Sequence, residues 1–193
     1  MKLISETYKE LQADGVWTDK DELGYLEDMY DLLLDRRDYE NILEIGCRGG
    51  GSISLWEECF PESNIFGVDI YDFPQPKRAT KIIGDAYCDE FVGQFDDSFF
   101  DVIIDDGAHT YSSFKDVVHK YHSKLKKGGL LVIEDLIRPY NGMGVTEAQQ
   151  QELLTVIVAN YNNVLVWDMT EKPKTQRLRN KWRKGLFVIS AYK

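Results

Sequence analysis

A short apolar run followed by a glycine cluster, within residues 41–56, constrains the fold of this chain more than any other feature. The stretch reads NILEIGCRGGGSISLW. The apolar run predicts a buried strand, and the spacing after the glycines predicts that the chain turns sharply into a helix. A strand, turn and helix of this kind are typical of an open α/β sheet, in which ligands bind beyond the carboxyl ends of the strands. We therefore expect this turn to form one wall of a ligand site.

The residues of this turn narrow the choice of ligand. Arg48 stands where the dinucleotide fingerprint needs its second glycine, and no Gly-Lys-Ser/Thr of a phosphate loop follows. The next apolar run, 64–70, carries Asp69 near its end, where an acid can accept hydrogen bonds from both hydroxyls of a ribose. The pattern indicates a site for an adenosine-containing molecule. The simpler alternative is a tight glycine turn in which Glu44 is a local hydrogen-bond acceptor.

The remaining segments alternate between strand and helix patterns. Five apolar runs alternating with helical segments predict a parallel, doubly wound α/β sheet in a single domain. Lys126 to Gly129 should end the helix that follows Thr110. The expected helices are 5–13, 19–37, 52–60, the segment after Thr110 and 146–161; the expected strands after the first two are 80–85, 98–106, 130–135, 163–168 and 186–192.

Acidic residues follow two strands that should be neighbours in this sheet. Asp106 ends the run 98–106, and Glu134 with Asp135 ends the run 130–135. Three carboxylates crowded in a partly desolvated cleft repel one another unless a cation neutralises them, and an all-oxygen set favours Mg²⁺ over zinc. Because side chains alternate along a strand, Asp105 and Asp106 cannot both face such an ion. We assign Asp106 to the metal and Asp105 to the cofactor side or to capping.

These motifs, taken in order, resemble a known enzyme family. E-x-G-x-x-G-G-G-S with an acid after the second strand resembles the class I S-adenosylmethionine-dependent methyltransferases. D-D-G-A-H and I-E-D are similar to D-D-G-S-H and I-E-D of the metal-dependent macrolide sugar O-methyltransferases and the related cephalosporin-hydroxylase-like proteins. T-D-K followed by G-Y-L-E-D-M-Y is similar to the N-terminal cap of that group. The resemblance implies a Rossmann-like, mostly parallel seven-stranded sheet with helices on both faces and a C-terminal antiparallel pair.

The resemblance also implies roles for individual residues. His109 would be the general base, with Asp106 beside it as the second catalytic residue, and Asp106, Glu134 and Asp135 would be the metal ligands. The alternative for His109 is a structural hydrogen bond at a helix N-terminus. S-adenosylmethionine and Mg²⁺ are the implied cofactors. The residues expected to contact S-adenosylmethionine are Glu44, Gly46, Arg48, Gly49, Gly50, Ser52, Asp69, Ile70, Asp85, Ala86 and Asp105.

The expected activity is methylation of a hydroxyl on a sugar or other small molecule with the help of a divalent metal. The alternatives are a metal-independent methyltransferase acting on nitrogen or nucleic acid, and a non-catalytic S-adenosylmethionine-binding protein. We expect a helical cap over residues 1–40 and a cofactor-binding core over 41–193, together one domain. Homo-oligomer formation is left open.

Charge and cysteine content restrict partners and compartment. The net charge of −10 disfavours a general electrostatic binder of nucleic acid or membranes. Cys47, Cys59 and Cys88 lack metal-site spacing, and no run is long enough to cross a bilayer, so we expect a cytoplasmic protein with reduced thiols. The basic stretch 172–184 is either a solvated loop or a recognition element for an anionic group.

Overall fold

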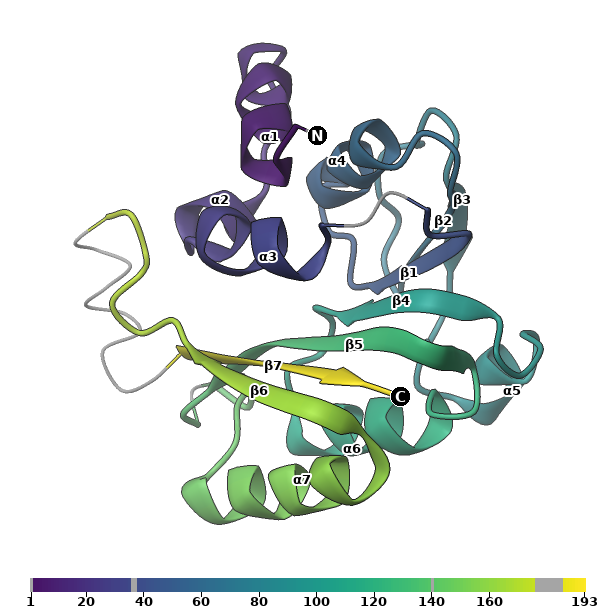
Figure 1. Ribbon diagram of the computed structural model, residues 1–193, viewed down its shortest axis with the longest axis vertical. Coiled ribbons are helices and arrows are strands. Elements are labelled where there is room, and N and C mark those ends of the chain that lie inside the picture. Colours follow the sequence, from purple (N-terminus) through teal and green to yellow (C-terminus); the bar gives the residue numbers. More distant parts are fainter. Residues whose placement is uncertain (1, 36–37, 140, 176–185) are drawn as a thin grey trace.

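The computed structural model describes residues 2–35, 38–139, 141–175 and 186–193, and these contain one seven-stranded sheet (Figure 1). The order of strands is β3-β2-β1-β4-β5-β7-β6. The first five are mutually parallel, while β7 is antiparallel to both β5 and β6. The predicted α/β fold class and its antiparallel C-terminal pair are confirmed. The strands are β1 (Asn41–Ile45), β2 (Asn64–Asp69), β3 (Thr80–Ile83), β4 (Phe100–Asp105), β5 (Leu125–Ile137), β6 (Asn162–Asp168) and β7 (Leu186–Tyr192).

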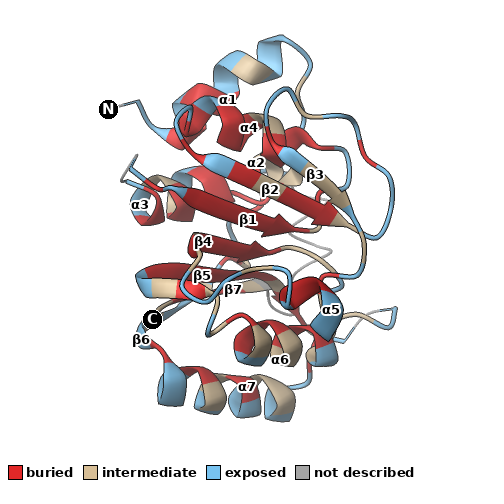
Figure 2. Ribbon diagram, turned by 90° about the vertical axis from the view of Figure 1, so that its right-hand side faces the viewer, coloured by how far each residue is buried: buried red, intermediate tan, exposed pale blue. Residues whose placement is uncertain are grey.

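Helices cover both faces of the sheet. On one face lie α1 (Ile4–Ala13) and α4 (Gly51–Cys59), and on the other lie α6 (Tyr111–Lys120) and α7 (Glu147–Asn160) (Figures 1 and 2). Successive residues of a strand serve opposite cores. Ile42 packs in the apolar cluster under α1 and α4, and Leu43 in the cluster under α6. The central strands are therefore apolar on both faces, which is the pattern of a doubly covered parallel sheet.

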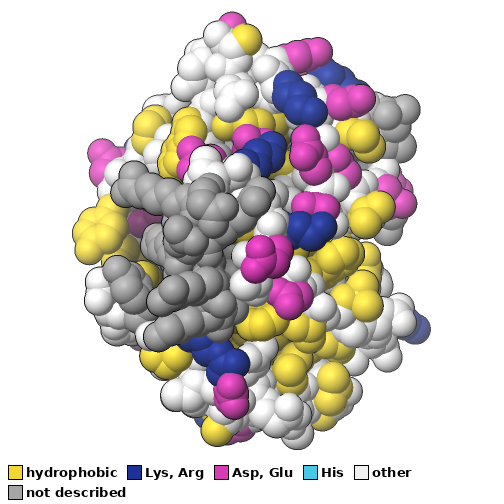
Figure 3. Space-filling view, turned by 90° about the vertical axis from the view of Figure 1, so that its left-hand side faces the viewer, with side chains coloured by type: hydrophobic (Ala, Val, Ile, Leu, Met, Phe, Trp, Pro, Cys, Tyr) yellow, Lys and Arg dark blue, Asp and Glu magenta, His cyan; other side chains and the backbone are white. Residues whose placement is uncertain are grey.

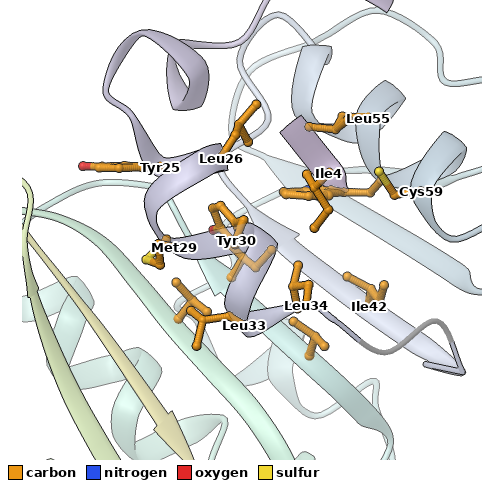
Figure 4. Close-up of a cluster of buried hydrophobic side chains, with 14 of the residues drawn as sticks. Ile4, Tyr25, Leu26, Met29, Tyr30, Leu33, Leu34, Ile42, Leu55 and Cys59 are labelled. Carbon is orange, nitrogen blue, oxygen red and sulfur yellow. The ribbon is translucent and has the colours of Figure 1, made fainter. Parts of the chain in front are cut away.

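The single helix predicted over 19–37 is wrong. The chain instead forms α2 (Asp19–Glu22), a π-helical turn η1 (Leu26–Tyr30) and α3 (Asp31–Leu33). Gly24 separates α2 from η1 with a φ of +81°, a left-handed value that ends a right-handed helix. Figure 4 shows the apolar side chains of this segment, including Leu26, Met29 and Tyr30, gathered against residues of α1, α4 and β1.

Other differences concern the ends of elements. Lys126 to Gly129 does not terminate a helix, because α6 already ends at Lys120 and β5 begins at Leu125, which pairs with Phe100 of β4. A short helix, α5 (Asp89–Val92), was not predicted. A capping box begins α7, since the Thr146 side chain accepts a hydrogen bond from the backbone N–H of Gln149 and the Gln149 side chain accepts one from the N–H of Thr146. Within the described residues, the structure contains no helix of the length and apolarity needed to cross a bilayer.

Candidate active site at the carboxyl ends of β4 and β5

The strand register places the predicted acidic residues at one edge of the sheet. Asp105 pairs with Ile45 of β1 on one side and with Ile133 of β5 on the other, so the next residues along β4 and β5, Asp106 and Glu134, are neighbours. The turn after β1 lies against the same edge. A Cβ atom added to Gly46 would stand 2.1 Å from the carbonyl oxygen of Asp106, so only glycine allows this approach.

Three side chains at this edge could hold a metal ion together. Asp106, His109 and Asp135 each offer one ligand atom, and these atoms lie within 4.8 Å of one another. Nε2 of His109 is 3.6 Å from Oδ1 of Asp106. All three residues are half-buried, so a ligand could reach them from solvent. The structure thus brings together two of the predicted metal ligands and the predicted base.

The backbone at two of these residues adopts an uncommon conformation. His109 and Asp135 have φ values of 51° and 55°, in the left-handed region that non-glycine residues rarely enter. Asp135 lies where the pairing of β5 with β7 shifts register, and a bulge of this kind redirects a side chain. The carbonyl of His109 accepts a hydrogen bond of 2.6 Å from the N–H of Gly144, which holds it in place. Backbone strain of this type clusters at functional sites.

The helical cap supplies hydrogen-bond partners to Asp106, Glu134 and Asp135. The hydroxyls of Tyr25 and Tyr30 donate hydrogen bonds to Asp135 and Glu134, respectively. Figure 4 shows Tyr25 pointing away from the other labelled side chains of its cluster. Lys20, from α2, places Nζ 2.6 Å from Oδ2 of Asp106 and 2.9 Å from both carboxylate oxygens of Glu134. Sequence reasoning missed these contacts, although T-D-K and G-Y-L-E-D-M-Y marked the residues that make them.

The carboxyl groups at the site outnumber the ammonium group that faces them. Burial alone would lower the pKa of Lys20, but Asp106, Glu134 and Glu44 raise it well above its usual range, so its ammonium group stays charged. Burial raises the pKa of Glu44, of Glu134 and of Asp135. One ammonium group therefore faces more carboxyl groups than it can neutralise, and a further cation would relieve their mutual repulsion.

The glycine turn and β2 form the second part of the site. Asp69 accepts hydrogen bonds of 2.9 Å from the backbone N–H groups of Cys47 and Arg48, so it fixes the turn. No atom lies within 4 Å of the Cβ position at Gly49, which leaves open space beside the backbone. Ile70, just after β2, is 60% exposed. These residues lie where the sequence predicted the cofactor, and their contact with it stays a prediction.

Other residues expected to contact the cofactor have protein partners. Glu44 is fully buried and accepts a hydrogen bond of 3.0 Å from the indole N–H of Trp56. Asp105 is fully buried and accepts a hydrogen bond of 2.7 Å from Tyr87, while its second oxygen has no partner among the described residues. Asp85 accepts a hydrogen bond from the N–H of Tyr87, a bond that is typical of a turn. Of the rest, Arg48 pairs with Asp19, Gly50 has a φ of +74° at the start of α4, and Ser52 and Ala86 are buried.

Glu134 differs from the other two predicted metal ligands. It is 1% exposed, and both its oxygens are bonded to Lys20. The ligand set Asp106, Glu134 and Asp135 stays a prediction, and the geometry favours Asp106 and Asp135 beside His109. The alternative for His109 was a structural hydrogen bond at a helix N-terminus. At the start of α6 this bond is made by Thr110, whose side chain accepts a hydrogen bond from the backbone N–H of Ser113.

The basic stretch 172–184 is described only as far as residue 175. Lys172 forms an ion pair of 2.9 Å with Asp28, and Lys174 one of 2.6 Å with Asp21. Figure 3 shows charged side chains of both signs close together on one face of the molecule. These two lysines therefore connect the stretch to the helical cap. Arg177, Arg179, Lys181, Arg183 and Lys184 lie outside the described residues.

Comparison with curated proteins shows what the chain is similar to. Over 119 residues it is 34% identical to the mycinamicin VI 2''-O-methyltransferase of Micromonospora griseorubida. Over 121 residues it is 33% identical to the demethylmacrocin O-methyltransferase of Streptomyces fradiae. The chain resembles the macrolide sugar O-methyltransferases. Each match covers 54% of the chain but only 30% of the relative, and no protein-family model matches.

Solved structures agree on the fold. A MycE methyltransferase of the mycinamycin pathway, in complex with Mg and SAH, superposes with a TM-score of 0.66 at 23% identity. The superposition covers 97% of this chain and 54% of MycE. A SAM-dependent methyltransferase from Archaeoglobus fulgidus superposes with a TM-score of 0.65 at 15% identity, over 96% of this chain and all of the other. The Rossmann-like methyltransferase fold of the described chain is thereby confirmed.

Proposed function

We propose that this protein transfers a methyl group from S-adenosylmethionine to a hydroxyl group of a sugar or other small molecule, with the help of Mg²⁺. The observation that carries the proposal is the convergence of Asp106, His109 and Asp135 beside the glycine turn. A protein that only bound S-adenosylmethionine would need no such cluster. The O-methyltransferases that the chain resembles act, by their names, on mycinamicin and demethylmacrocin.

The residues present fit a hard divalent ion. Mg²⁺ is commonly held by one or two carboxylates and keeps several water ligands, and Asp106 with Asp135 would provide two carboxylates. The surplus of carboxyl groups over ammonium groups at this edge favours such an ion over a neutral ligand. Bound there, Mg²⁺ would lower the pKa of a hydroxyl group of the acceptor.

His109 would accept the proton of that hydroxyl group. Imidazole is the side-chain group that enzymes use most often as a general base. The Nδ1 atom of His109 is buried and has no hydrogen-bond partner among the described residues. Asp106 faces the other ring nitrogen, Nε2, and would orient the ring and stabilise its charged form.

The glycine turn and the end of β2 would bind the methyl donor. Its sulfonium methyl is already activated, so the protein has mainly to align the acceptor with it. Asp69 would accept hydrogen bonds from the ribose, and Ile70 offers an exposed apolar surface for the base. Gly46, Arg48, Gly49, Gly50 and Ser52 belong to the same proposed site, as do Asp85, Ala86, Asp105 and Glu44 at its borders.

The proposal extends to organisation and location. Residues 1–40 would act as a cap that completes the acidic edge of the core, residues 41–193. Cys47, Cys59 and Cys88 form no disulfide bond with one another, which agrees with a reducing compartment such as the cytoplasm. The acidic net charge favours a small-molecule acceptor over nucleic acid.

Removal of divalent metal tests the proposal directly. Protein treated with EDTA and assayed with a panel of glycosides that carry free hydroxyl groups should lose methyl transfer from radiolabelled S-adenosylmethionine. Added Mg²⁺ should restore it, because the hydroxyl would again be acidified. Undiminished transfer in excess chelator would remove the metal from the mechanism, and absence of transfer despite tight cofactor binding would contradict the enzymatic role.

A further inference from the structure

Lys20 is the most enclosed cation at the acidic edge. Its side chain is 1% exposed and comes from α2, 86 residues before Asp106 in the sequence. Nζ lies 2.6 Å from Asp106, 2.9 Å from both oxygens of Glu134 and 3.2 Å from Glu44. A lysine is almost never fully buried unless it is paired, and here three carboxylates surround one ammonium group.

The contacts of Lys20 divide the acidic cluster into an inner and an outer part. Glu44 and Glu134, the inner carboxylates, are 0% and 1% exposed. Asp106 belongs to both parts, because its Oδ2 contacts Lys20 and its Oδ1 faces His109. Asp135 is half-buried and belongs to the outer part.

We propose that Lys20 is a tethered counter-cation that occupies the inner part, keeps Glu134 out of metal coordination and orients Asp106 toward the outer part. The inference builds on the proposed function, and it assigns the divalent ion to Asp106 and Asp135 alone, beside His109. An ammonium group that contacts both oxygens of Glu134 takes the positions from which that carboxylate would bind a metal. Lys20 is thus a positioning residue for the metal site.

The local structure holds Lys20 in this position. The side chain of Thr18 accepts a hydrogen bond from the backbone N–H of Lys20, and the N–H of Thr18 donates to the hydroxyl of Tyr8. The next residue of the sequence after Thr18, Asp19, forms an ion pair of 3.1 Å with Arg48 of the glycine turn. Thr18 and Asp19 are therefore both held by neighbouring elements, and the side chain of Lys20 points toward the acidic edge.

The first experiment measures the coupling between Lys20 and Glu134 without metal. Thermal unfolding at pH 8 in EDTA is compared for wild type, Lys20→Met, Glu134→Gln and the double variant. Lys20→Met should lower the Tm by about 10 °C because it leaves buried carboxylates uncompensated. The Tm of the double variant should be higher than that of Lys20→Met by at least about half of this decrease, since the charge of Glu134 has been removed.

A surface lysine provides the matched control. Lys126 also contacts two acids, Glu40 at 2.7 Å and Asp101 at 3.0 Å, but it is 28% exposed. Lys126→Met should lower the Tm by no more than about 3 °C, because exposed ion pairs contribute little. The counter-cation role would be overturned if the decrease in Tm of the double variant equalled the sum of the decreases for Lys20→Met and Glu134→Gln.

The second experiment asks which carboxylates bind the ion. Mn²⁺, which replaces Mg²⁺ and gives an electron paramagnetic resonance signal, is titrated into wild type, Glu134→Gln and Asp135→Asn. Glu134→Gln should change the Kd by less than about threefold, whereas Asp135→Asn should raise it at least about tenfold. Equal weakening by the two changes would show that Glu134 is a ligand and would overturn the inference.

The two readouts separate the inference from the proposed function. If the wild-type protein bound no Mn²⁺, the metal role in the proposed function would be overturned. The claim that Glu134 is excluded from metal coordination would then be overturned as well. The coupling between Lys20 and Glu134 is measured in EDTA and therefore does not depend on metal binding. If no coupling is found, the counter-cation role is overturned even if the protein binds Mn²⁺.

Discussion

His109 and Asp135 both hold left-handed backbone conformations at the edge where β4 and β5 end. Each such conformation costs on the order of 1 kcal/mol for a non-glycine residue, so the surrounding hydrogen bonds have to enforce it. The contacts of Gly144 with His109 and of Tyr25 with Asp135 do this. The strained backbone aims an imidazole and a carboxylate at the same small volume, which ordinary strand and helix geometry would not do.

Replacement of His109 by Asn separates the proposed base from the metal site. We expect kcat to fall by roughly 10²–10⁴, the usual contribution of a general base. The Kd for Mn²⁺ should stay within about threefold of wild type, because Asp106 and Asp135 remain. Stopped assays with radiolabelled methyl donor and a Mn²⁺ titration check both values. A parallel loss of rate and metal affinity would make His109 a ligand and not a base.

The acidic residues of this edge were predictable from the sequence, whereas their partners were not. The motifs D-D-G-A-H and I-E-D mark strand ends, and parallel strands place such ends at one edge. Lys20, Tyr25 and Tyr30 reach that edge only because Gly24 and a π-helical turn change the direction of the cap. Periodic apolar residues predicted one continuous helix, since hydrophobic spacing does not report a single glycine with positive φ.

At the scale of elements, the cap is held from both sides. It packs against α4, and the segment after β6 lies against it through the ion pairs of Lys172 and Lys174. The backbone N–H of Lys174 also donates to the carbonyl of Glu22. A Cβ atom at Gly24 would lie 3.0 Å from the carbonyl oxygen of Lys172, so the two segments are in close contact.

Two glycine-to-alanine changes measure this contact. Gly24→Ala should lower the free energy of unfolding by about 2–3 kcal/mol, since it adds the contact with Lys172 to the cost of a positive φ. Gly15→Ala is the matched control, with a φ of +86° and no atom within 4 Å of its Cβ position. It should cost only about 1–2 kcal/mol. Urea unfolding compares the two, and equal losses would contradict close packing of the segment on the cap.

The sheet was the most predictable part of the whole molecule. Runs such as 42–45, apolar except for Glu44, and 130–133 are buried on both faces, and this pattern is typical of a covered parallel sheet. The start of β5 at Leu125 was missed because Lys126 to Gly129 is a helix-stop pattern, whereas pairing with β4 decides the outcome. Tertiary pairing of this kind overrides local propensity.

Stability of the whole molecule should depend on pH through Asp105. Burial raises the pKa of Asp105 to about 6, from an ordinary value of about 4. Between these pH values the folded protein binds more protons than the unfolded chain, so the free energy of unfolding falls as the pH rises through this window. Asp105→Asn removes this contribution and keeps an acceptor for Tyr87.

Urea unfolding in EDTA at pH 4 to 7 tests this expectation. From pH 4 to pH 7, the stability of wild type relative to Asp105→Asn should fall by up to about 3 kcal/mol. Glu44, Glu134 and Asp135 are common to both proteins, so the difference isolates Asp105. A constant difference across this range would mean that Asp105 titrates normally.

The ammonium group of Lys20 and the carboxylate of Glu134 stand 114 positions apart in the chain. During synthesis on the ribosome the cap emerges first, yet the strand that completes its polar contacts emerges much later. In a nascent chain, Lys20, Tyr25 and Tyr30 therefore lack their partners Glu134 and Asp135 until β5 has left the exit tunnel. The same separation means that the acidic edge is complete only once β5 has been synthesised, so a chain truncated before β5 would lack it.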